Sequence, residues 1–290
     1  MKIAYIILAY KNPEQVFRMI NKLQSENTSF FLHIDYYANF EGFLKIPKEI
    51  NQKRLHFSTK RFKTNWSSFG CVNALLHNMK TITESPEKFD FVITLTGQDY
   101  PIKNPAELEN FLQTNRNNIF MSNFKLPSPI WKNGGIERVM SYHFNIFRKR
   151  ILIKILHRSM IILMPFLPAK KLDISYDLYG GEAHFAFPIE IVNYILNFLN
   201  ENPIFLNFFK HTYMPDEVIF QTLIMNSKHK NKVMDNTLKY IDWSTPEFGL
   251  PATMNYDYAE KIKTNRNFFA RKFDVQKDSK ILDYIDREIL

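Results

Sequence analysis

Residues 2–35 read KIAYIILAYKNPEQVFRMINKLQSENTSFFLHID, and this stretch decides the fold class of the chain. Residues 2–10 are apolar nearly throughout, which is typical of a central parallel strand buried on both faces. Pro13 then opens a segment whose apolar side chains recur at helical spacing, and a second apolar run over 30–34 predicts another strand. A strand, a helix and a strand in this order form a βαβ unit, so we predict an α/β fold.

The same pattern continues along the first third of the chain. Further strands are predicted at 55–57 and 89–95, with a helix over roughly 69–83 between them. The last of these strands leads into a stretch rich in turn residues, Thr96-Gly97-Gln98-Asp99-Tyr100-Pro101. Ligands of open α/β sheets bind beyond the carboxyl ends of the strands, where Asp35 and Asp99 lie. Each acid is equally typical of a structural turn, so both interpretations stay open.

Composition limits the classes of function. With 45% hydrophobic and 23% charged residues the chain is globular rather than disordered. Its single cysteine, Cys71, excludes an internal disulfide and a multi-cysteine metal cluster. The apolar N-terminus indicates a buried strand rather than a signal peptide, and no apolar run reaches the ~18 residues that span a bilayer. We expect one domain, residues 1–290, in a cytoplasmic protein.

Charge narrows the partners. The net charge of +9 favours an anionic partner, such as a nucleotide phosphate, an acidic glycan or a membrane surface. Nucleic acid is not expected, because the basic residues are scattered rather than arranged in a stripe. Between residues 148 and 171, Arg148-Lys149-Arg150, His157-Arg158 and Lys170-Lys171 flank apolar runs. That pattern is typical of a helix on the inner face of an anionic membrane, and equally of a buried helix with solvated ends.

Residues 212–223 read TYMPDEVIFQTL, in which a proline and two acids precede an apolar helical pattern. Proline at a helix start costs no hydrogen bond, and carboxylates there are favoured by the positive end of the helix dipole. One interpretation is a well-capped helix. The other is that Glu217 is held, ionised, at a helix N-terminus as a general base.

No Asp-x-Asp occurs anywhere in the chain. Many nucleotide-sugar transferases use such a pair to hold Mn²⁺ or Mg²⁺ against the diphosphate. A chain that uses a UDP-sugar without that pair needs fixed positive charge, which arginine and lysine side chains supply. Arg271 and Lys272 lie between Phe269 and Phe273, a setting that favours partial burial and a bound anion over a solvated pair.

Six segments resemble, in order, those of the core-2/I-branching β-1,6-N-acetylglucosaminyltransferases, a family that includes the peptide O-xylosyltransferases. Each segment alone is weak evidence for the resemblance, but six segments in the same order are strong evidence. The resemblance implies a GT-A-type nucleotide-sugar-binding fold with a mostly parallel central sheet flanked by helices. It also implies an inverting, metal-independent transfer from a UDP-sugar. The segments are Ile3–Ile7, His33–Asp35, Gly97–Lys103, Tyr213–Glu217, Tyr240–Trp243 and Phe269–Asp274.

The resemblance further implies roles for single residues and a division of the domain into halves. Residues 1–115 would mainly bind the nucleotide, and 116–290 would hold the acceptor, the base and the basic segment. Glu217 matches the general base of the family, and Lys272 matches its diphosphate-binding lysine. No metal ligand and no cofactor is expected. The expected donor-binding residues are Leu8, Tyr10, Asp35, Trp66, Arg271 and Lys272, and the expected acceptor-binding residues are Asp99, Arg138, Asp216 and Trp243.

Three departures from the family leave the donor sugar open. Ser67-Ser68 follows Trp66 where relatives carry Gly-Gly, Glu182 follows Gly181 where they carry Gly-Ser, and a basic residue is missing before Gly249. We expect transfer of N-acetylglucosamine from a UDP-sugar to a glycan or lipid-linked glycan in bacterial surface polysaccharide synthesis. The alternatives are UDP-galactose or UDP-xylose as donor, and a non-catalytic carbohydrate-binding α/β module.

Overall fold

The computed structural model describes residues 1–144, 149–168, 170, 172, 176–244 and 250–290. The chain forms two compact units, each built from separate stretches of the sequence. Unit 1 comprises Met1–Thr59, Ser85–Asn117 and Leu238–Leu290, and unit 2 comprises Lys60–Glu84 and Asn118–Thr237. The predicted division of labour between 1–115 and 116–290 stays a prediction. Arg148, Lys171 and Gly249 lie outside the described residues.

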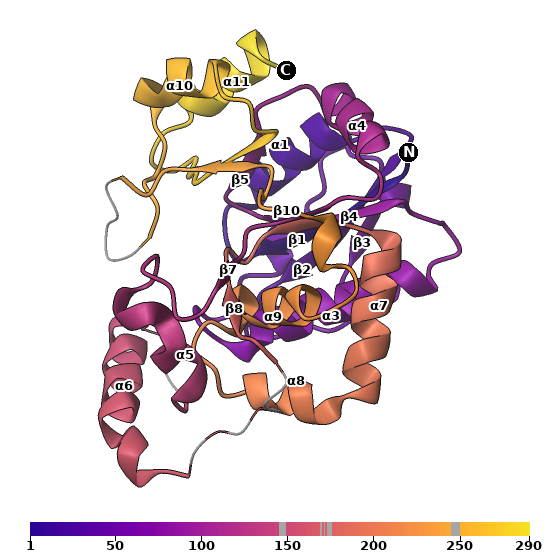
Figure 1. Cartoon of the computed structure of the whole chain (residues 1–290). Helices are drawn as coiled ribbons and strands as arrows, with labels where there is room; N and C mark the ends of the chain where they lie inside the picture. The colour runs from indigo at the N-terminus through magenta and orange to yellow at the C-terminus, as the bar shows by residue number, and fades with distance from the viewer. Residues whose placement is uncertain (145–148, 169, 171, 173–175, 245–249) are drawn as a thin grey trace. The chain divides into compact units, whose positions relative to one another are not determined.

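A parallel sheet lies at the centre of unit 1 (Figure 1). Its four strands follow the order β4 (Phe91–Thr96), β1 (Ile3–Ala9), β2 (Thr28–Ile34) and β3 (Leu55–Phe57). All adjacent pairs are parallel, and all of β1 except Leu8 is buried. Burial on both faces explains why β1 reads as an unbroken apolar run. The predicted α/β class, with a mostly parallel sheet flanked by helices, is confirmed.

Helices and a second sheet complete unit 1. Helix α1 (Pro13–Leu23) joins β1 to β2, as predicted, and buries Val16, Met19 and Ile20. Arg18 of α1 donates to Asp283 and Asp286 of α11, which ties the C-terminal helix to it. The second sheet contains β11 (Lys239–Ile241), β12 (Phe269–Arg271) and β5 (Asp99–Pro101). The remaining helices are α2 (Glu41–Leu44), α4 (Pro105–Thr114), α10 (Ala259–Lys263) and α11 (Lys280–Glu288).

Gly97 and Gln98 form the predicted turn, but the residues that follow it form a strand. Asp99, Tyr100 and Pro101 form β5, whose residues pair antiparallel with β12, Asp99 opposite Arg271. The strand forms because β12, which is distant in sequence, offers unpaired backbone groups along this edge. Local turn residues could not reveal a partner more than a hundred residues away.

Unit 2 contains two groups of paired strands and several helices (Figure 1). Strand β6 (Ile119–Met121) pairs in parallel with β10 (Val233–Met234) and antiparallel with β9 (Phe185–Pro188). Strands β7 (Phe124–Lys125) and β8 (Tyr179–Gly180) form an antiparallel pair. The helices are α3 (Phe69–Glu84), α5 (Ile136–Met140), α6 (Arg150–Leu163), α7 (Ile189–Glu201), α8 (Pro203–Phe209) and α9 (Ile219–Met225).

Helix α6 lies in the stretch for which we weighed a membrane-surface helix against a buried one. Two of the basic residues, His157 and Lys170, are buried, contrary to the expected solvated ends. The Lys170 ammonium donates to Val139 O and Thr212 Oγ1, both at 2.8 Å. Its burial lowers the pKa of Lys170 to about 7. In the described part of the chain, no helix combines the length and apolarity that crossing a bilayer requires.

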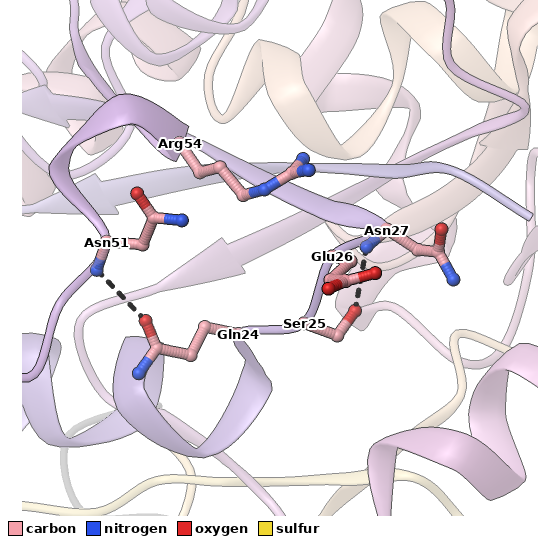
Figure 2. A pocket seen from close by; sticks show the side chains of 6 residues that line it. All are labelled: Gln24, Ser25, Glu26, Asn27, Asn51 and Arg54. Atoms are coloured by element: carbon pink, nitrogen blue, oxygen red, sulfur yellow. Dashed lines mark hydrogen bonds between the residues drawn. The ribbon is translucent and has the colours of Figure 1, made fainter.

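An open polar depression lies in unit 1 at the amino end of β2 (Figure 2). Gln24 Oε1 accepts a hydrogen bond from Asn51 N, and Ser25 Oγ accepts one from Asn27 N. Ligands of parallel sheets bind at the opposite, carboxyl ends of the strands. We therefore assign no ligand to this depression, which is lined by Gln24, Ser25, Glu26, Asn27, Asn51 and Arg54.

Candidate active site

Glu217 is the last residue of a 3₁₀ turn, Pro215–Glu217, in unit 2. Pro215 starts this turn as predicted, but Val218, with φ −135°, separates the turn from α9. The prediction of one helix with Glu217 in its first turn was therefore wrong. The turn is fixed through the backbone, because Gly181 N donates to Glu217 O at 2.9 Å and Glu217 N donates to Met214 O at 3.1 Å.

The Glu217 carboxylate lies in a mostly buried and acidic setting. Its side chain is 20% exposed, and Arg138 Nη1 donates to Oε2 at 3.2 Å. Burial, followed by the charge of Asp216, raises the pKa of Glu217 to about 8, although Arg138 opposes both effects. We had expected a helix dipole to keep this carboxylate ionised. The raised pKa runs against this expectation, because desolvation outweighs the nearby positive charge.

Trp131 supports Arg138 and was missed by the sequence analysis. The Arg138 guanidinium lies 4.2 Å from the centre of the Trp131 ring, a cation–π distance that orients its donors. Gly135 and Gly180 allow this packing, because a Cβ on either would come within 2.5 Å of the Trp131 ring. A rare tryptophan followed at short spacing by Gly134-Gly135 was the signal that could have found it.

Glu182 brings a third carboxylate into the neighbourhood of Glu217 and contributes to its raised pKa. Its Oε2 accepts from Thr237 Oγ1 at 2.9 Å, and its carbonyl accepts from Gln221 Nε2 at 2.8 Å. The preceding Gly181 is required for close packing, since a Cβ there would come 2.1 Å from Ser122 O. The departure from the family pattern at Glu182 therefore alters the charge around the candidate base.

Trp66, predicted to bind the donor, belongs to unit 2. The Arg150 guanidinium lies 4.1 Å from the Trp66 ring centre, and Tyr213 packs edge-on to the ring at 5.4 Å. The Tyr213 ring in turn stacks on His157 at 3.8 Å. Trp66 thus shares an aromatic and basic cluster with the residue that opens the Tyr213–Glu217 motif.

Unit 1 holds a second, basic cluster around Lys272. Burial lowers the pKa of Lys272, and the charges of Arg271, Lys11 and Lys277 lower it further, whereas the charge of Asp274 opposes them. Among the residues that the structure describes, the Lys272 ammonium forms no ion pair. A half-buried ammonium surrounded by other cations favours a bound anion.

The buried carboxylate of Asp99 orients the Arg271 guanidinium. The Asp99 carboxylate is fully buried and accepts from Arg271 Nη1 at 3.0 Å and from Lys239 Nζ at 2.7 Å. Arg271 also donates to Thr96 Oγ1. This buried carboxylate has a structural role in the present conformation, and the acceptor-binding role of Asp99 stays a prediction. With one negative and two positive charges, the group keeps one net positive charge, carried to the surface by Arg271, whose side chain is 19% exposed.

Asp99→Asn should destabilise the protein by about 3–5 kcal/mol, because it leaves the Lys239 ammonium, only 1% exposed, without its buried counter-charge. The free energy of unfolding in urea measures this change. Asp283→Asn in the same unit is the matched control. The Asp283 side chain pairs with Arg18 but is 57% exposed, so we expect its variant to lose less than about 1 kcal/mol of stability. Equal losses in the two variants would contradict the assignment.

The predicted uridine-binding residues follow the carboxyl ends of two neighbouring strands of unit 1. Tyr10 is 55% exposed, and its hydroxyl donates to Gln98 Oε1 at 3.1 Å. Leu8 is half-buried near the end of β1. Asp35 N donates to Ala9 O at 2.8 Å, and its Oδ1 accepts from Tyr37 N at 2.9 Å. Asp35 therefore forms the local turn that was one of its two interpretations, and its uridine-binding role stays a prediction.

Trp243 follows β11 in unit 1 and is 50% exposed. The preceding Asp242 accepts from Ser244 N at 2.8 Å and from Tyr258 Oη at 2.9 Å, which fixes the backbone beside the ring. An exposed aromatic on a fixed backbone is suited to packing on a sugar.

In the described residues, no three His, Cys, Asp or Glu side chains converge as metal ligands. Metal independence stays a prediction.

Comparison with known proteins identifies the family. The sequence model of the Core-2/I-Branching enzyme family matches residues 3–268. The chain therefore belongs to this family of glycosyltransferases. Xylosyltransferase 2 of Rattus norvegicus is 24% identical over 317 residues, which cover 99% of this chain and 33% of the relative. Xylosyltransferase oxt of Drosophila pseudoobscura pseudoobscura is 25% identical over 234 residues, 79% of this chain and 24% of the relative.

The chain spans between a quarter and a third of the length of these curated relatives. A putative glucose-1-phosphate thymidylyltransferase from Bacillus anthracis covers 72% of this chain and 83% of its own, at 12% identity and a TM-score of 0.33. A similarity at that level carries no argument about function. The family assignment rests on the sequence match alone.

Proposed function

We propose that this chain is an inverting, metal-independent glycosyltransferase that moves a sugar from a UDP-sugar to a hydroxyl of a glycan acceptor. The observation that carries the proposal is the Glu217 carboxylate, which is partly buried, paired with Arg138 and given a pKa of about 8. A general base works best when its pKa lies near the working pH. By the resemblance of the Tyr213–Glu217 segment to the family, Glu217 matches the general base.

The proposed reaction is a single displacement. Glu217 takes the proton of an acceptor hydroxyl, whose oxygen forms a bond to the anomeric carbon of the donor. The bond between that carbon and the diphosphate oxygen breaks, and UDP leaves from the opposite face with the electron pair. Lys272 and Arg271 stabilise the negative charge that develops on the diphosphate. Arg138 orients the base and lowers its pKa against the effect of burial.

The support for metal independence is the fixed positive charge of unit 1. Lys272 carries a half-buried ammonium. The group of Asp99, Lys239 and Arg271 keeps one net positive charge, which Arg271 presents at the surface. Cations held in place by the protein can stabilise a leaving diphosphate as a bound metal ion does. Lys11 also acts on Lys272, but its partner Asp274, at 2.6 Å, opposes that effect, so Lys272 and Arg271 carry this support.

For the donor we propose UDP-N-acetylglucosamine first. UDP-xylose is the second donor to test, because the named relatives are xylosyltransferases. UDP-galactose is the third donor to test. The proposed acceptor is a glycan, free or lipid-linked, in the synthesis of a surface polysaccharide. Its expected setting, a bacterial cytoplasm, stays a prediction.

The experiment that tests this function is donor hydrolysis and thermal shift across a panel of UDP-sugars, in EDTA and again with Mn²⁺. Turnover of one UDP-sugar in EDTA would support the metal-independent transferase and identify its donor. Turnover only with Mn²⁺ would contradict metal independence. UDP binding without turnover of any donor would favour the non-catalytic carbohydrate-binding module.

The rate of transfer should rise with pH through a value of about 8, because Glu217 accepts a proton only when ionised. Arg138→Met should move this inflection to higher pH, since Arg138 lowers the pKa of Glu217. A pH profile of kcat/KM for both proteins checks the position of the inflection, and a flat profile across this range would contradict the base assignment.

The raised pKa of Glu217 also makes the free energy of unfolding depend on pH. Its contribution to stability is fully present below the ordinary pKa of 4.5 and is lost as pH rises through about 8.

A further inference from the structure

Helix α6 exposes an apolar face in unit 2. Ile151, Ile155 and Ile162 lie on one stripe, because positions i, i+4 and i+11 share a face of an α-helix. Their exposed fractions are 62%, 56% and 67%. Beyond the helix, Phe166 is 84% exposed. The opposite face of α6 packs inward through Ile153 and His157, so the exposed stripe is not needed for that packing.

The sequence around α6 carries charge of one sign. Residues 138–172 contain eight lysines and arginines and no aspartate or glutamate, although the chain holds 29 acids in 290 residues. Arg150 stacks on Trp66 and Lys170 is buried, so neither is available to a partner. Lys149 at the start of α6 and Arg158 on its outward side are exposed. Lys149 immediately precedes the first residue of α6, and Arg158, seven residues after Ile151, lies beside the isoleucine stripe.

We propose that the outward face of α6 binds the surface of an anionic lipid bilayer, with the helix lying in the plane of the interface. An apolar stripe flanked by cations is the pattern of interfacial helices, whose apolar side chains enter the acyl boundary while the cations meet anionic headgroups. Charge complementarity decides against a second copy of this chain, since docking two such faces would bring like charges together without a counter-charge. Such a contact would hold the enzyme close to a lipid-linked acceptor.

The test is co-sedimentation with vesicles of phosphatidylcholine that contain phosphatidylglycerol, and with vesicles of phosphatidylcholine alone. The full chain should bind the anionic vesicles, and the binding should weaken as salt is added. The triple variant I151S/I155S/I162S should bind the anionic vesicles at least about a hundredfold more weakly, because three apolar side chains no longer become buried in lipid. Ile204→Ser on α8 is the matched control. It removes an equally exposed isoleucine, 76% exposed, from the same unit and should bind as the wild type does.

A second variant, K149E/R158E, tests the charges and keeps the test decisive if the triple variant does not fold. It should lose most of the preference for anionic vesicles, whereas Lys228→Glu, also exposed in unit 2, should not. Failure of the wild type to bind, or unchanged binding by both variants, would overturn the proposal. A wild-type dimer that the triple variant abolishes, without vesicle binding, would instead assign the face to a second copy. Vesicle binding needs neither donor nor acceptor, so its failure is distinct from failure of the proposed transferase.

Discussion

Glu217→Gln should abolish sugar transfer and leave UDP binding intact. Glutamine has nearly the shape of glutamate but cannot accept the acceptor proton, and loss of a general base typically costs about 10²–10⁴ in rate. The glutamine carbonyl can still accept from Arg138, so the 3₁₀ turn and its packing should survive. The diphosphate is assigned to Lys272 and Arg271 in unit 1, and the substitution leaves those residues unchanged.

The measurement is kcat with the donor identified by the panel, together with the Kd of UDP by calorimetry. Glu190→Gln on α7 is the matched control, because its exposed carboxylate pairs only with Lys232 at 2.8 Å among the described contacts. That variant should keep wild-type activity. A Glu217→Gln protein that turns over normally but has lost affinity for UDP would reverse the role assignment.

Glu217 also shows where sequence reasoning reaches its limit. Pro215 and the two acids that follow it predicted the start of a helical segment, and the chain does turn there, because proline fixes φ and needs no donor. The raised pKa could not be predicted in the same way. It depends mainly on burial, then on the adjacent Asp216 and on the distant Arg138 and Glu182. Of these causes, a local pattern shows only Asp216.

The βαβ unit, by contrast, could be predicted almost to the residue. The run over 2–10 became β1 (Ile3–Ala9), and the segment opened by Pro13 became α1 (Pro13–Leu23). Such elements are encoded by local periodicity, which a sequence displays directly. The ion pairs of Asp99 could not be predicted, for the opposite reason. Its partners Lys239 and Arg271 lie 140 and 172 residues further along the chain, and only the fold brings them to it.

The basic segment 268–274 lies between these extremes. Its aromatic neighbours predicted partial burial, and the Phe269 and Phe273 side chains are indeed buried. Burial of the flanking rings holds the backbone, so that Arg271 and Lys272 cannot move freely into solvent. The sequence could not show that Asp99 uses part of the charge of Arg271, which leaves Lys272 as the ammonium without an ion pair in the described structure.

Lys272→Ala should therefore weaken UDP binding and slow transfer together. Loss of a contact that stabilises developing charge typically costs about 3 kcal/mol, or roughly a hundredfold in rate. Because UDP already carries the diphosphate charge, part of this loss should appear as a higher Kd for UDP. Uridine has no phosphate, so its weaker affinity should not change. The ratio of UDP to uridine affinity thus isolates the charge contact from any general damage to the pocket.

Lys263→Ala is the control for this prediction. Lys263 is an exposed lysine at the end of α10 in the same unit, and removing it changes the net charge equally. If long-range charge alone attracted UDP, both variants would lose affinity to the same extent. If Lys272 contacts the diphosphate, only Lys272→Ala should lose it, and Lys272→Arg should recover part of the affinity. An unchanged UDP affinity in Lys272→Ala, with transfer intact, would show that the diphosphate binds elsewhere. In the described structure Lys11 pairs with Asp274 and Arg271 pairs with Asp99, whereas the half-buried Lys272 has no described ion pair.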